Sequence, residues 1–258
     1  MSTIASAGPS LARLTLLHAR YQLIETLRVP MAVIGTLVFP ALALVFFVVP
    51  QRVVAENPVY ATQAVISLAV FAVMSNSLFG FGLAIAENRE KPWDPYLRTL
   101  PAPGLARVLA LLLSTGGLGL LAVVPVIAVG GILTAAEASP ARILAGFVAL
   151  AIAALPFMLI GTAIGYSMPF KAAMAVIQIV MFALAFIGGL FLPPLLFPDW
   201  LDVISRFTPT RQARELVIWA VEGGPLEWWV WVGILAWIAV SLALALALFR
   251  RDEGRRYR

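Results

Sequence analysis

The chain has 258 residues, of which 62% are hydrophobic and 12% are charged, and its mean hydropathy is +0.97. Soluble domains are about 45–50% apolar and about 25% charged, so this composition excludes a water-soluble fold. The apolar residues occur in blocks, and a helix needs about 20 apolar residues to cross a bilayer. The composition therefore predicts one membrane domain.

Two residue types that carry much enzyme chemistry are nearly missing. The chain has no cysteine and one histidine, His18, which excludes disulfides, thiolate nucleophiles and a histidine metal cluster within one chain. The net charge is +5, but the basic residues flank the apolar blocks, as membrane orientation requires. We therefore expect the lipid bilayer as a partner, no nucleic acid, and no cofactor or metal in this chain.

Residues 1–30 form the first predicted unit. Within residues 11–28, arginines fall between apolar residues that recur at helical spacing. These apolar residues are Leu14, Leu17, Tyr21, Ile24 and Leu27. The pattern predicts an amphipathic helix that lies along the membrane surface.

Six apolar blocks follow within residues 31–249, and a basic tail occupies residues 250–258. The predicted spans are 31–50, 62–86, 105–134, 143–168, 172–192 and 228–249. Their apolar runs are continuous rather than alternating, which favours helices over a β-barrel. The predicted fold class is therefore all-α integral membrane, with six transmembrane helices.

Basic residues are distributed unequally between the segments that join these spans. With a cytoplasmic N-terminus, the outside holds Arg52, Arg142, Arg206, Arg211 and Arg214. The inside then holds Arg13, Arg20, Arg28, Arg89, Lys91, Arg98, Arg107, Lys171, Arg250, Arg251, Arg255, Arg256 and Arg258. This asymmetry predicts that both termini are cytoplasmic, which agrees with an even number of spans.

Several ways of driving transport lack the residues that they need. No predicted span has an acid in its middle, which disfavours proton coupling, although sodium sites built from backbone carbonyls remain open. The acids are dispersed, which disfavours a membrane enzyme. A phosphate-binding loop needs a lysine after a glycine, but the only lysines, Lys91 and Lys171, follow other residues. If ATP drives this protein, another polypeptide must bind it.

Two segments between the spans are rich in proline, charge and aromatic residues. The first, residues 86–103, joins the second and third spans on the predicted cytoplasmic side. It matches the pattern R-E-x-G-T-L-x-x-L-R-x-T-P at Arg89, Glu90, Leu97, Arg98 and Pro101, whereas Pro92, Trp93 and Asp94 replace Gly-Thr-Leu. The second follows the fifth span, and its distinctive residues are Gly189, Leu190, Phe191, Pro193, Pro198, Trp200, Leu201, Ile204, Ser205 and Pro209.

Both segments resemble those of the permease subunits of type-2 ABC exporters, a family that includes drug, lipid and polysaccharide exporters. The resemblance covers nearly the whole chain. It implies a cytoplasmic coupling helix between spans two and three and a short external re-entrant or helical element between spans five and six. It also implies two permeases, most simply a homodimer with the first and fifth spans near the two-fold axis, bound to two cytoplasmic ATPase subunits that carry ATP and Mg.

The resemblance assigns roles to three sets of residues. The ATPase-coupling set is Glu87, Arg89, Glu90, Trp93, Asp94, Tyr96, Leu97 and Arg98. The external gate set is Pro193, Pro194, Pro198 and Trp200. The candidate substrate path is Asn76, Gln178, Met181, Phe182 and Phe186.

Each set also has a simpler interpretation. The coupling segment can be an anchor loop, the external prolines an interfacial turn, and Asn76 and Gln178 hydrogen-bonding groups between helices. The small residues Gly161 and Gly165 fit either packing within the chain or a dimer contact. Met181, Phe182 and Phe186 fit lipid-facing or core positions as well as a substrate path.

Two functional hypotheses therefore stay open. The favoured one is an ABC exporter permease, which is not itself an enzyme, in the cytoplasmic membrane of a prokaryote. Its substrate is a hydrophobic or amphipathic compound. The alternative is an ATP-independent carrier, facilitator or scaffold.

Overall fold

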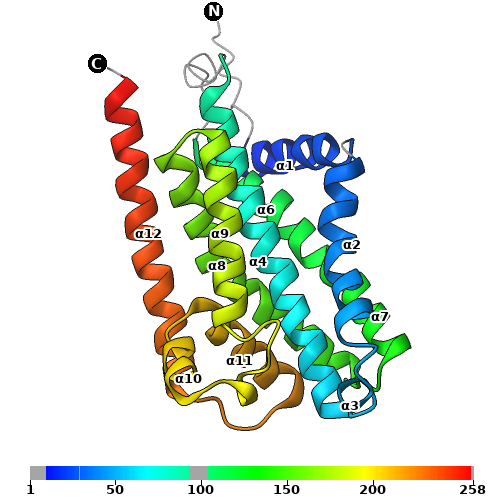
Figure 1. Cartoon of the computed structure of the whole chain (residues 1–258). Coiled ribbons are helices and arrows are strands. Elements are labelled where there is room, and N and C mark those ends of the chain that lie inside the picture. Colours follow the sequence, from blue (N-terminus) through cyan, green and yellow to red (C-terminus); the bar gives the residue numbers. More distant parts are fainter. Residues whose placement is uncertain (1–9, 29, 93–103, 257–258) are drawn as a thin grey trace, which may run out of the picture.

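The computed structural model describes residues 10–28, 30–92 and 104–256, and the described residues form helices and turns without a strand. The helices are α1 (Leu11–Leu27), α2 (Pro30–Phe47), α3 (Arg52–Ala55), α4 (Pro58–Glu90), α6 (Gly104–Leu121), α7 (Val123–Leu133), α8 (Pro140–Ser167), α9 (Phe170–Ile187), the 3-10 turn η1 (Pro194–Leu196), α10 (Asp199–Arg206), α11 (Pro209–Glu222) and α12 (Trp228–Arg256). The long helices run side by side in one bundle, as Figure 1 shows.

Five stretches of the described helices are long and apolar enough to cross a membrane. They are Pro58–Glu90, Leu109–Leu133 across α6 and α7, Pro140–Ser167, Phe170–Ile187 and Trp228–Asp252. They coincide with five of the six predicted spans. The remaining predicted span, 31–50, corresponds to α2, which packs against α4 and α7. Within α2, the segment Leu37–Phe47 is an apolar helix, but it is shorter than the five stretches above. The all-helical prediction holds, and the count of six spans remains a prediction.

Several predicted boundaries shift for local reasons. The predicted span 62–86 is longer as α4, because Asn57 accepts hydrogen bonds from the backbone N–H groups of Val59 and Tyr60 and so caps an earlier start. The predicted span 105–134 is two helices with a break at Ala122. The predicted span 172–192 ends early, at Ile187, because Gly188 and Gly189 turn the chain and Gly189 has a φ of +78°.

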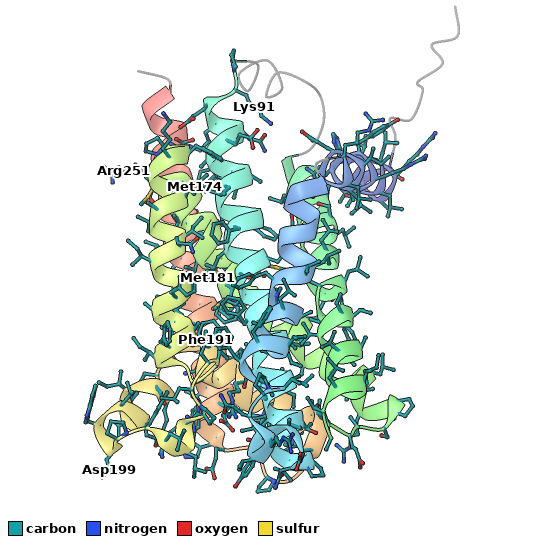
Figure 2. All side chains as sticks on the ribbon, turned by 45° about the vertical axis from the view of Figure 1, so that its right-hand side comes forward. Lys91, Met174, Met181, Phe191, Asp199 and Arg251 are labelled. Atoms are coloured by element: carbon teal, nitrogen blue, oxygen red, sulfur yellow. The ribbon has the colours of Figure 1, made fainter. Side chains whose placement is uncertain are left out.

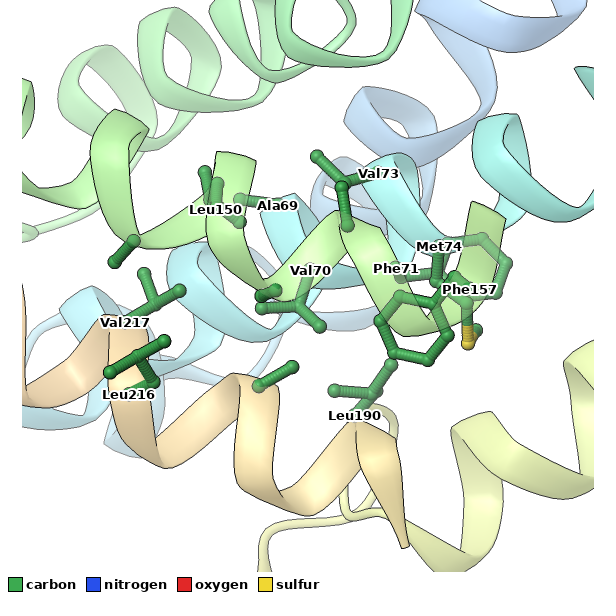
Figure 3. Close-up of a cluster of buried hydrophobic side chains, with 14 of the residues drawn as sticks. Ala69, Val70, Phe71, Val73, Met74, Leu150, Phe157, Leu190, Leu216 and Val217 are labelled. Atoms are coloured by element: carbon green, nitrogen blue, oxygen red, sulfur yellow. The ribbon is translucent and has the colours of Figure 1, made fainter. Parts of the chain in front are cut away.

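Helix α4 lies at the centre of the bundle and contacts α2, α6, α7, α8, α9 and α11. Its side chains Phe71, Met74 and Leu78 are almost completely buried, together with Phe157 of α8 and Ile177 of α9. Figure 3 shows this cluster continuing to α11, where Leu216 and Val217 face α4 and α8.

Glycines bring α4 and α8 into close contact. A Cβ atom on Gly161 would lie 3.0 Å from the carbonyl oxygen of Leu78, and a Cβ atom on Gly165 would lie 2.6 Å from that of Gly82. Only glycine allows backbones to approach so closely. The two small residues of the predicted small-xxx-small pattern therefore pack within the chain, against α4.

The bundle has two different ends. Helix α1 lies across one end of the bundle, and the C-terminal part of α12 lies at the same end (Figure 1); we call this the α1 end. Helix α1 packs on α6, where Ser114 donates a hydrogen bond to Gln22 at 2.9 Å. Helices α3, α10 and α11 lie at the opposite end, which we call the α11 end.

Candidate functional site

The last turn of α4, at the α1 end, holds the described part of the predicted coupling set. The side chain of Arg89 pairs with Asp252 of α12, with 3.0 Å between Nε and Oδ1. It also donates to the carbonyl oxygens of Gly165 and Met168, at 2.8 and 3.3 Å. The last carbonyl groups of a helix have no hydrogen-bond partner within it. Arg89 therefore supplies donors to the carbonyl groups at the end of α8 and, through Asp252, links α4 to α12.

Glu90 makes the corresponding contact with the beginning of α9. Its Oε1 accepts a hydrogen bond from the backbone N–H of Phe170 at 2.8 Å, the first residue of α9. A carboxylate at this position is favoured by the helix dipole. Glu87 pairs with Lys91 one turn away, with 3.2 Å between Oε1 and Nζ. The predicted coupling residues Trp93, Asp94, Tyr96, Leu97 and Arg98 lie outside the described residues.

The predicted substrate-path residues do not form one cluster. The side-chain amide of Asn76 donates to the carbonyl oxygen of Thr115 at 2.7 Å, which directs it to α6. Met181 is 5% exposed and belongs to the core. Gln178 and Phe186 are exposed on the outer face of α9. Asn76 is thus a hydrogen-bonding group between helices, as the simpler interpretation expected.

Two of the path residues, Phe182 and Phe186, belong to an aromatic cluster beside α9. The ring of Phe191 lies 5.2 Å from that of Phe186, 6.5 Å from that of Phe182 and 4.9 Å from that of Phe71. Figure 2 shows Met174, Met181 and Phe191 along the side of the bundle that α9 forms. Phe39 of α2 is 6.2 Å from Phe71, so the cluster links α2, α4 and α9.

The predicted external gate residues lie in the turn and helix that follow α9. Pro193 and Pro194 begin the 3-10 turn, and Pro198 precedes α10. Trp200 is 65% exposed on α10. A hydrogen bond from α12 stabilises the end of α10: the indole N–H of Trp237 donates to the carbonyl oxygen of Phe207 at 2.8 Å.

Helix α11 brings a charged side chain into the interior, which the sequence analysis missed. Arg214 donates to Ser67 at 2.9 Å, to Gln63 at 3.2 Å and to Glu215 at 3.0 Å. Burial lowers the pKa of the Arg214 guanidinium, and Glu215 opposes this shift. Arginine stays charged in proteins, so these three partners offset the loss of water around it. The bonds to Ser67 and Gln63 also fix α11 on α4.

One sequence signal for α11 was available. Ala213, Leu216, Val217 and Ala220 are buried and have the spacing of one helix face. Thr208 accepts from the backbone N–H of Arg211 and caps the helix. This pattern predicts a helix packed in the bundle, but the partners of Arg214 on α4 are more than 140 residues away in sequence and no local pattern indicates them.

The fold, with its long apolar helices, defines a multi-pass helical membrane protein. The family model described as "ABC-2 type transporter" matches residues 13–222. The chain therefore belongs to the ABC-2 type transporter family. It is also 23% identical, over 223 residues, to "Putative transport permease YvfS" of Bacillus subtilis (strain 168); the match covers 86% of this chain and 91% of that protein.

Proposed function

We propose that the chain is the membrane-spanning permease subunit of an ABC exporter. Two copies form the conduit, and two cytoplasmic ATPase chains that bind ATP and Mg drive alternating access. The exported compound is hydrophobic or amphipathic, of the class of drugs, lipids or glycan-linked lipids. Family membership supports a transport permease, and the contacts below support the mechanism.

The observation that carries the mechanism is the set of contacts made by the last turn of α4. Arg89 reaches α8 and α12, and Glu90 reaches the first residue of α9. The predicted coupling residues continue directly from this turn. A force applied to them is therefore passed to α8, α9 and α12 at their ends rather than to α4 alone.

The outer face of α9 supports the pairing of two permeases. Gln178 lies midway along α9, is exposed, and makes no hydrogen bond to another described residue. A side-chain amide without a partner in hydrocarbon costs about 2 kcal/mol or more. A second permease against this face supplies polar atoms that lipid does not have.

Cross-linking tests this pairing in a chain that has no native cysteine. We expect Gln178→Cys in membranes to form a disulfide-linked dimer under mild oxidation. Val148→Cys, on the exposed face of α8, is the control that should remain monomeric. Equal dimer formation by both variants contradicts the proposed interface.

Reconstitution tests the exporter function. The permease and a cognate ATPase, placed together in vesicles, should move an amphipathic dye only with ATP. Trp93→Ala should insert and dimerise normally but lose ATPase association and transport, because aromatic anchors contribute about 2 kcal/mol or more to an interface. Transport at the wild-type rate without an ATPase supports the alternative, an ATP-independent carrier.

The proposed location is the cytoplasmic membrane of a prokaryote, with both termini inside. Asp199 of α10 and Arg255 of α12 lie at opposite ends of the bundle. Asp199→Cys should react with an impermeant thiol reagent from outside, and Arg255→Cys only after the membrane is opened. Equal reaction of both from outside overturns the orientation.

A further inference from the structure

A cavity opens at the α11 end between α7 and α8. Helix α7 packs on α2 and α4, whereas α8 packs on α4, α11 and α12. The space between them, over α4, holds a cavity of about 200 Å³. Its inner lining is apolar and includes Ile66, Val123, Ile127, Leu150 and Val217.

The mouth of this cavity has a different chemistry. It continues into an open hollow of about 660 Å³ that shares Thr62, Glu137, Ala138 and Val221 with the inner cavity. The hollow adds Arg142 and Glu222. Polar groups therefore lie at the end of the bundle and apolar groups lie deeper, along α4, α8 and α11.

The segment that forms the mouth is fixed in place. The backbone N–H of Glu137 donates to the hydroxyl of Thr62 at 3.1 Å, and the backbone N–H of Ala135 donates to the carbonyl oxygen of Ala55 at 2.7 Å. The carboxylate of Glu137 makes no hydrogen bond or ion pair to another described residue. It is therefore available to a ligand at the mouth.

We propose that this cavity is a binding site for one amphiphile with a positively charged headgroup, whose alkyl end enters the apolar part. An apolar cavity of about 150 Å³ is known to accept a benzene ring, so about 200 Å³ admits the end of one chain. The carboxylate of Glu137 lines the mouth and makes no hydrogen bond or ion pair to another described residue, so it favours a cation there. No described residue of α2 or α9 lines the cavity, so the site is separate from the proposed path between permeases.

A photoreactive probe tests the site in the purified permease without the ATPase. The probe is a dodecyltrimethylammonium that carries a diazirine near the end of its chain, added to the permease in phosphatidylglycerol nanodiscs. We expect saturable labelling of α7, α8 and α11 at the cavity, displaced by dodecyltrimethylammonium and not by dodecyl sulfate. Labelling confined to lipid-facing residues such as Ile132 and Val148, or labelling that does not saturate, overturns the proposal.

Two glycines in neighbouring helices provide a matched pair of variants. Gly131 lines the cavity, Gly117 does not, and a Cβ atom on either meets no atom within 4 Å. Gly131→Leu should reduce labelling roughly tenfold, because the leucine and the alkyl chain compete for one small space. Gly117→Leu should label as wild type. Equal labelling of the two variants overturns the proposal.

The charge at the mouth is tested separately, with variants that leave the cavity volume unchanged. Glu137→Gln should weaken labelling by the cationic probe roughly threefold, as expected for one exposed charge pair, and leave a maltoside probe of equal chain length unaffected. Equal loss for both probes contradicts the cation preference.

The amphiphile can be a membrane lipid or a soluble compound. Native mass spectrometry of the wild-type permease and of Gly131→Leu distinguishes these two sources. An aminolipid with a net positive headgroup, retained by the wild type alone, identifies a membrane lipid. An empty wild type that takes up added dodecyltrimethylammonium identifies a soluble amphiphile. No adduct of either kind with the wild type overturns the proposal.

Discussion

The two ends of the bundle are held together in different ways. At the α11 end, a whole helix enters the core: Leu216 and Val217 are 1% and 2% exposed, and Arg214 is buried beside them with its partners on α4. At the α1 end, α9 and α12 are tied to α4 by the side chains of Arg89 and Glu90, which reach helix ends and one carboxylate.

This difference indicates which end can move. Separating α11 from α4 exposes apolar surface and takes Ser67 and Gln63 away from the buried Arg214, so we infer that the α11 end moves as one body. Separating α9 or α12 from the end of α4 breaks a few hydrogen bonds, which contribute about 1–3 kcal/mol each when one partner is charged. The α1 end, which the proposed orientation places on the cytoplasmic side, is thus suited to a reversible change. The following variants test this comparison.

The largest effect is expected at Arg214. Arg214→Met keeps an unbranched side chain, although a shorter one, and leaves Ser67, Gln63 and Glu215 without the guanidinium. Breaking a buried charge pair costs about 3 kcal/mol, so the free energy of unfolding should fall by that order. Thermal unfolding in detergent measures it. The control is Arg206→Met: that arginine is paired with Asp202 on the surface of α10, and its loss should hardly change the melting temperature. If the two variants have the same melting temperature, the inference that the α11 end is rigid is contradicted.

A smaller effect is expected at Arg89. Arg89→Ala removes the contact with Asp252 and two bonds to the end of α8, and should lower the free energy of unfolding by about 2 kcal/mol. The double variant with Asp252→Ala should lose less than the sum of the single losses, because the two residues share one interaction. Lys91→Ala, which removes a pair with the exposed Glu87, is the control. If the double variant loses the sum of the two single losses in free energy of unfolding, the proposed interaction of Arg89 with Asp252 between α4 and α12 is contradicted.

Gly165→Ala tests whether α4 and α8 move as a pair. The added methyl group would lie 2.6 Å from the carbonyl oxygen of Gly82, so the helices must separate, at a cost of about 1–2 kcal/mol. Gly117→Ala, with open space around it, should be neutral or stabilise the chain by up to about 1 kcal/mol. The comparison of their unfolding temperatures measures the closeness of α4 and α8, and a Gly165→Ala variant as stable as Gly117→Ala contradicts it.

The sequence predicted much of this fold because a segment that crosses lipid must be apolar and must satisfy its own backbone hydrogen bonds, which leaves the helix as its structure. Continuous apolar runs predict helices, and capping residues such as Asn57 and Thr208 show why boundaries shift by a few residues. What local patterns did not predict are contacts between distant segments: Arg214 with Gln63 and Ser67, or Arg89 with Asp252, which are separated by 163 residues. Such pairs depend on which helices become neighbours, and periodicity does not specify that.

The smallest change in stability, with the most informative effect on function, is expected at Glu90. Its carboxylate is exposed, so water screens it and Glu90→Gln should lower stability by about 0.5 kcal/mol or less. The bond to the first N–H of α9 weakens, however, and motion of α4 should then pass less effectively to α9. We expect ATPase association and ATP hydrolysis to remain near wild type while transport per ATP falls. Glu25→Gln, which changes an exposed glutamate of α1 outside the coupling set, is the control. Association lost together with transport instead identifies Glu90 as a docking residue. Unchanged transport per ATP shows that the contact with Phe170 carries no motion.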